Sequence, residues 1–96
     1  MYLAFTQTTI SDTIVLGSTL AASYLESTFV EFQAGGQNVR YTMDAATDPT
    51  QSKGMLLIAG CELKLFQMED FTRARFIRGA GSDATLNAHF IAGRDT

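Results

Sequence analysis

The stretch that decides the fold is STFVEFQAGGQNVRYTMD, residues 27–44. Before the glycine pair at 35–36, every second residue shares one face, and this face carries Thr28, Val30, Phe32 and Ala34. After it, Val39, Tyr41 and Met43 alternate with polar residues. Apolar–polar alternation is typical of half-buried β-strands, and adjacent glycines tolerate the positive φ of a tight reversal. The stretch therefore predicts two strands separated by a turn.

The same period of two recurs along the chain. Further strands are expected in DTIVLGS (12–18), CELKLFQ (61–67), FTRARFIRG (71–79) and DATLNAHFIA (83–92). In CELKLFQ, the alternation predicts that Leu63 and Leu65 lie on the apolar face. Short strands with turn residues at regular spacing predict an all-β fold, a small antiparallel β-sandwich or barrel of the jelly-roll or immunoglobulin-like kind.

Ninety-six residues fit one domain. Residues 11–96 are expected to form the sandwich. Residues 1–10, MYLAFTQTTI, are expected to form an edge strand or an arm that pairs with a neighbouring subunit. In TLAASYLES (19–27), Leu20 and Tyr24 have helical spacing, so one short helical turn is expected near 20–26.

Composition excludes several functions. The formal net charge is −3, so no nucleic-acid partner is expected. The apolar runs are too short to span a bilayer and no signal peptide is expected at Met1, so synthesis in the cytoplasm is predicted and no membrane association. One cysteine and one histidine cannot build a disulfide or a zinc site. Charged residues make up only 18%, which favours a surface partly covered by other protein.

The residues that could carry chemistry lack partners in the sequence. A general-base role of His89 would require a nucleophile, and the sequence contains no nucleophile motif. Cys61 is followed by an acidic residue, which disfavours a reactive thiolate. The spacing of Asp44 and Asp48 does not fit a calcium loop, so Asp44 is expected to accept backbone N–H bonds and Asp48 to start the turn at Asp-Pro. No enzyme activity, cofactor or metal is therefore predicted.

Arg73, Arg75 and Arg78 form the only basic cluster. Arg73 and Arg75 are two residues apart and are expected on one strand face. They either bind an acidic partner through forked hydrogen bonds or pair across strands with acidic residues of this chain. The second alternative names Glu62, Glu69 and Asp70.

Several motifs occur together in a fixed order. They are Val39-Arg40-Tyr41, Asp44 with Pro49-Thr50, Gly54 to Gly60, Phe76-Ile77-Arg78 and Ala84-Thr85-Leu86-Asn87. In this order they resemble a family of small virion proteins of tailed bacteriophages, over residues 13–90. Where the family has glycine after the aspartate this chain has Ala45, and its loop, DAATDPT, is longer, which together disfavour a glycine-dependent positive-φ turn at that position.

The resemblance implies a β-sandwich subunit of the virion that decorates or cements the head. Its partners would be the major capsid protein or other virion subunits, and a homo-oligomer is expected, with a trimer favoured. The predicted contact residues are Tyr2, Leu3, Phe5, Phe29, Phe66, Phe71, Arg73 and Arg75. The alternative is a tail, baseplate or host-surface carbohydrate-binding module, which the absence of tryptophan disfavours.

Overall fold

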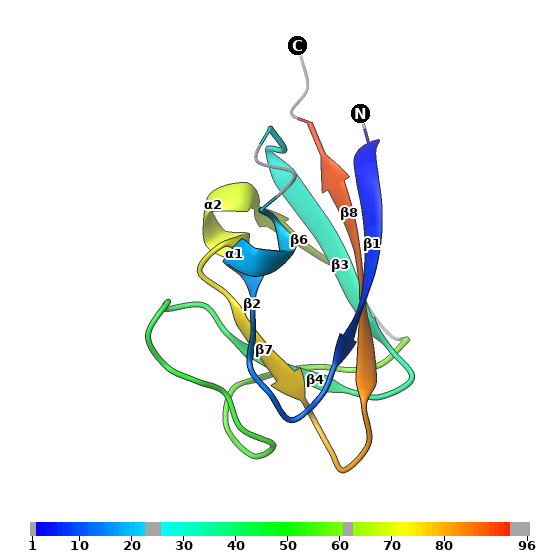
Figure 1. Cartoon of the computed structure of the whole chain (residues 1–96), viewed down its shortest axis with the longest axis vertical. Coiled ribbons are helices and arrows are strands. Elements are labelled where there is room, and N and C mark those ends of the chain that lie inside the picture. The colour runs from blue at the N-terminus through cyan, green and yellow to red at the C-terminus, as the bar shows by residue number, and fades with distance from the viewer. Residues whose placement is uncertain (1, 23–25, 61–62, 93–96) are drawn as a thin grey trace.

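Two four-stranded antiparallel sheets face each other in the computed structural model, which describes residues 2–22, 26–60 and 63–92 (Figure 1). Sheet A has the order β1 (Tyr2–Ile10), β8 (Ala84–Ile91), β3 (Phe29–Gly35), β6 (Lys64–Gln67). Sheet B has the order β2 (Val15–Leu16), β7 (Arg75–Arg78), β4 (Val39–Thr42), β5 (Met55–Leu57). Two short helices are α1 (Gly17–Leu20) and α2 (Met68–Phe71). The prediction of an all-β antiparallel sandwich is confirmed.

Alternate residues of both sheets fill the space between them. Phe32 of β3 lies at the centre and is fully buried. Its ring centroid is 6.2 Å from that of Tyr41, 4.9 Å from Phe66 and 5.8 Å from Phe76. Buried aromatic rings contribute most of the apolar area of such a core, and edge-to-face pairs add stabilisation beyond that area.

The two helices close one end of the core (Figure 1). The helical turn expected near 20–26 is α1, which lies earlier, at 17–20, and residues 23–25 fall outside the described residues. The Gly17 N–H donates to the Ala74 carbonyl at 2.8 Å. A Cβ on Gly17 would overlap the Phe71 carbonyl oxygen, so the close approach of α1 to α2 requires glycine.

The segment 71–79 is not the single strand that its pattern predicts. Residues 68–71 form α2, a turn follows, and only Arg75–Arg78 is strand β7. Glu69 and Asp70 lie in the first turn of α2, where carboxylates are favourable. The helix places Phe71 in the core, with ring centroids 5.6 Å from Phe32 and 5.9 Å from Phe90.

The prediction that Leu63 and Leu65 lie on the apolar face is also wrong. They are 58% and 60% exposed. In the pairing of β6 with β3, Phe66 lies opposite the buried Val30 and Leu65 lies opposite Glu31. The phenylalanine therefore takes the core-facing phase, and the leucines take the outer phase.

The glycine reversal and the long loop connect the layers. Gly36 has φ +73, and the chain passes there from β3 in sheet A to β4 in sheet B. The loop of residues 43–54 then returns to β5, which pairs antiparallel with β4. This loop is thus the connection that lets two neighbouring strands pair.

Candidate interaction surface

The side of sheet A that faces away from sheet B, here called the outer face, is built from rows of residues that lie opposite one another on neighbouring strands. One row crosses all four strands and consists of Phe5, His89, Glu31 and Leu65. A second row has Gln7, Asn87 and Gln33, and a third has Ile91, Phe29 and Gln67. The antiparallel register thus gathers side chains from positions 5 to 91 on one surface.

The outer face combines apolar side chains with uncharged polar ones. Phe5 is 53% exposed, and its ring centroid is 4.9 Å from that of His89. The Gln7 side-chain amide donates to Asn87 Oδ1 at 3.0 Å. The only formal charge in these rows is on Glu31, whose Oε1 is 3.7 Å from His89 Nδ1. Little charge therefore has to be desolvated when another protein covers this face.

On sheet B, in contrast, the outward side binds a loop of the same chain. Two arginines that alternate with core residues of β4 and β7 bind the loop of residues 43–54. Arg40 Nε donates to the Gln51 carbonyl at 3.1 Å, and its Nη1 donates to the Gly54 carbonyl at 2.9 Å. Pro49 in the same loop is fully buried. The outward side of sheet B is therefore partly occupied by the loop (Figure 1, green).

The loop is further held at its tip. Asp44 Oδ1 accepts the N–H of Ala46 at 3.0 Å and of Thr47 at 2.8 Å, and the Thr47 hydroxyl donates to Oδ2 at 2.6 Å. These bonds, that of the Thr47 hydroxyl first, lower the pKa of Asp44 to about 2. The prediction that Asp44 accepts backbone N–H bonds is confirmed.

Ala45 adopts a positive φ although it is not glycine. Its φ is +61, so the expectation that Ala45 disfavours a positive-φ turn at this position is wrong. Arg75 Nη2 donates to the Ala45 carbonyl at 2.8 Å, and Arg75 Nη1 contacts Asp48 Oδ1 at 2.5 Å. The hydrogen bonds to Asp44 and these two contacts of Arg75, together called the clamp on the loop, fix the positive φ of Ala45, which an L-residue alone disfavours. Asp48 thus also pairs with Arg75, which the sequence analysis does not anticipate.

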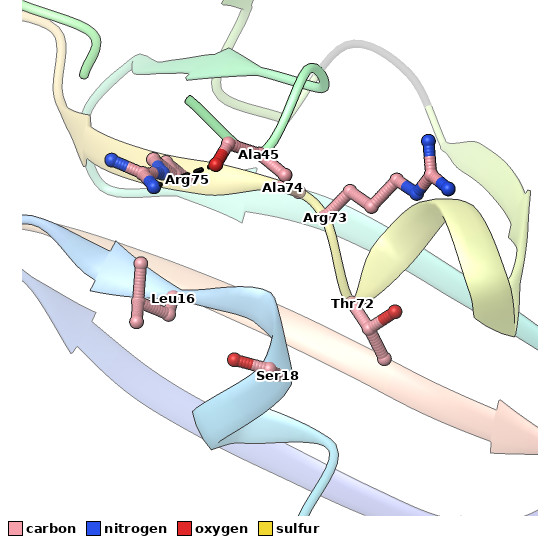
Figure 2. Close-up of a pocket in the computed structure, with 7 residues that line it drawn as sticks. All are labelled: Leu16, Ser18, Ala45, Thr72, Arg73, Ala74 and Arg75. Carbon is pink, nitrogen blue, oxygen red and sulfur yellow. Dashed lines mark hydrogen bonds between the residues drawn. The ribbon is translucent and has the colours of Figure 1, made fainter. Parts of the chain in front are cut away.

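A pocket of about 170 Å³ lies between α1, the loop tip and the turn before β7 (Figure 2). It is lined by Leu16, Ser18, Ala45, Thr72, Arg73, Ala74 and Arg75. The two arginine side chains run in opposite directions along it, so they do not converge on one ligand position (Figure 2).

The predicted arrangement of the arginines is wrong in two respects. Arg73 lies in the turn after α2 rather than on the strand, so it does not share a strand face with Arg75. Arg75 and Arg78 pair with Asp48 and Asp83 instead of the expected acidic residues, and Glu62 lies outside the described residues. Within the described ranges the exposed Arg73 guanidinium has no hydrogen-bond or ion-pair partner.

The predicted aromatic contacts divide between the surface and the core. Phe5 and Phe29 lie on the outer face. The expectation that Phe71 is exposed is wrong, because its exposed fraction is 0%, and Phe66 is half-buried against the core. Tyr2 and Leu3 contribute backbone to β1, while their side chains, like Cys61, fall outside what the structure describes.

Several exposed apolar residues in or next to strands β5 and β6 are not among the contacts predicted from the sequence. These are Met55, Leu56, Ile58, Leu63 and Leu65. The alternation of residues 61–67 carries the signal, because both phases contain large apolar residues. The presence of Phe66 in the other phase is the one local indication that this phase faces the core and that Leu63 and Leu65 face outward.

No protein-family model, curated protein or solved structure matches the chain. The helices in the described residues have four residues each, which is shorter than a bilayer span requires.

Proposed function

We propose that the chain is a non-enzymatic structural protein of a bacteriophage virion, which coats or cements the capsid shell. The outer face of sheet A binds neighbouring virion subunits, foremost the major capsid protein. The observation that carries this proposal is the asymmetry of the sandwich. Arg40 and Arg75 hold the loop against the outward side of sheet B, whereas sheet A leaves a nearly uncharged surface with Phe5 and Leu65 exposed.

The energetics of such a surface suit a repeated contact. Phe5 and Leu65 expose apolar area on this face, and exposed apolar patches of roughly a few hundred Å² mark interaction sites. A contact of this size is weak for a single copy. Many copies placed by the symmetry of a shell bind through avidity, so no single contact has to be strong.

Other features agree with an adhesive role. The exposed Arg73 offers a second, cationic contact at the far end of α2 for an acidic group on a neighbouring subunit. A sugar-binding module usually stacks its ligand on exposed aromatics, and among the described residues only Phe5 is a large exposed aromatic side chain. The geometry therefore favours protein–protein contact over carbohydrate binding.

The experiment starts with particles purified from the phage that encodes the chain. Quantitative mass spectrometry is expected to find the chain in a fixed copy ratio to the major shell protein. Absence of the chain from purified particles overturns the proposal.

A matched pair of variants then locates the contact. Leu65→Lys changes the outer face, and Met55→Lys changes the edge of sheet B, at residues that are 60% and 62% exposed. Sedimentation with shells that lack the chain is expected to show at least about tenfold weaker binding for Leu65→Lys, the effect of losing one buried leucine contact. Met55→Lys is expected to bind like the wild type. The reverse order contradicts the outer face as the binding surface.

A further inference from the structure

Strand β1 presents a long free edge. It lies at the end of sheet A, and its pairing with β8 is regular from Ala4 to Ile10, after a register shift between Tyr2 and Ala4 (Figure 1). No other strand in the described ranges pairs with it. Because alternate backbone groups of an edge strand point away from the sheet, this edge offers a row of unpaired N–H and C=O groups to another strand.

This edge lacks most of the features that usually prevent strand addition. Natural edge strands carry charged residues or proline, or are very short. Residues 1–11 contain no Asp, Glu, Lys, Arg or Pro. The other three edge strands are much shorter, with four residues in β6, three in β5 and two in β2. Strand β1 is thus the one long, neutral edge among the described strands.

We propose that β1 pairs with β1 of a second copy, antiparallel and around a two-fold axis at Gln7, so that the two A sheets form one continuous eight-stranded sheet. The regular part of the strand, Ala4 to Ile10, has Gln7 as its midpoint. Among the described edges, only another β1 offers a free strand of equal length. This inference extends the proposed function by naming a second copy as a partner, and rests on it only for the role of the dimer on a particle.

The side chains suit this pairing. With Gln7 on the axis, Phe5 lies opposite Thr9 of the second copy and Thr6 lies opposite Thr8 of the second copy. Aromatic–β-branched and Thr–Thr pairs across antiparallel strands are favourable, and a neutral strand meets its own copy without opposing like charges. The contact is isologous, so it closes as a dimer rather than as the trimer that the sequence analysis favours.

The test uses the same substitution at two exposed glutamines on opposite edges of sheet A. Gln7→Lys places two lysines against each other at the proposed axis, whereas Gln67→Lys changes the β6 edge. Light scattering coupled to size exclusion is expected to give a dimer mass for the wild type and for Gln67→Lys, and a monomer mass for Gln7→Lys. Circular dichroism checks that each variant is folded.

A charge reversal makes the test specific. Gln7→Glu alone is expected to be monomeric, and an equimolar mixture of Gln7→Lys and Gln7→Glu is expected to regain the dimer mass. Hydrogen exchange of the wild type is expected to slow in residues 4–10 as the protein concentration rises.

The inference is overturned by a wild type that is monomeric or trimeric, by a Gln7→Lys protein that keeps the dimer mass, or by a mixture that stays monomeric. Protection of β1 only in the presence of particles assigns the edge to a capsid strand and also overturns it. A wild type that is monomeric but still binds shells overturns the dimer and leaves the proposed function standing. A wild type that is dimeric but absent from particles supports the dimer and overturns the proposed function.

Discussion

Replacing Phe71 by alanine distinguishes the buried position that the structure gives this residue from the surface contact that is predicted from the sequence. Phe71 ends α2, is fully buried and lies within ring-contact distance of three other phenylalanines. The centroid distances are 5.6 Å to Phe32, 5.8 Å to Phe76 and 5.9 Å to Phe90. Phe71→Ala therefore leaves a cavity at the end of the core that the helices close.

The expected loss follows from burial and from these contacts. Burial of one phenylalanine side chain contributes about 1.5–3 kcal/mol, and each aromatic pair adds about 0.5–1.5 kcal/mol, although pairs lost together are not additive. Measured Phe→Ala changes in cores cost about 3–5 kcal/mol, and we expect a value in this range. A chain of this length has a stability of about 5–14 kcal/mol, so the loss takes a large share of it and lowers the thermal midpoint by at least about 12 °C.

Urea unfolding followed by circular dichroism measures the loss, with the slope checked for two-state behaviour. Phe5→Ala is the matched control, because Phe5 is 53% exposed, and its cost is expected to stay below about 1 kcal/mol. If Phe71→Ala costs as little as the control while shell binding falls, Phe71 is a surface contact and the described core is wrong.

Four further changes test local features. Gly17→Ala is expected to cost about 1–3 kcal/mol of unfolding free energy, measured with urea, because the added methyl group meets the carbonyl oxygen that ends α2. Ala45→Gly is expected to raise stability by about 0.5–1 kcal/mol in the same assay, since relief of the positive φ exceeds the added entropy of the unfolded chain. The pKa of Asp44 is lowered from 3.8 to about 2 in the folded protein, so its stabilising contribution is present above about pH 4 and is lost as the pH falls towards 2. Carboxyl-resolved NMR is expected to give a titration midpoint near 2 for Asp44. A midpoint near 3.8 contradicts the hydrogen-bonded turn. Arg75→Ala is expected to increase proteolysis within residues 43–54, because it removes the clamp on the loop, whereas Arg73→Ala leaves the cleavage rate unchanged.

The sequence predicts the strands best where one phase is apolar and the other polar. Residues 30–34 and 39–42 alternate cleanly, and the apolar positions of the pattern, Val30, Phe32, Ala34, Val39 and Tyr41, are the buried ones in the structure. The pattern fails in residues 61–67, where Leu65 and Phe66 give both phases a large apolar residue. Pairing with β3 decides the phase there, and it is not a local property of the chain.

The helix α2 is missed for a related reason. The run from Phe71 to Arg78 alternates roughly enough to fit a strand, so the acidic pair Glu69-Asp70 is not used as a helix-start signal. The clamp of the loop by Arg40 and Arg75 is beyond local reasoning, because it joins residues 14 and 30 positions apart. Candidate contacts could be predicted by residue type, but which of them face solvent depends on the register of the sheets.

The outer face of sheet A as the contact surface is tested most directly by hydroxyl-radical footprinting of the chain, free and on the particle. Labelling of Phe5 and Leu65 is expected to fall strongly on particles, while Leu16 and Met55 on sheet B keep their labelling. Unchanged labelling of Phe5 and Leu65 together with protection of Leu16 and Met55 would contradict it.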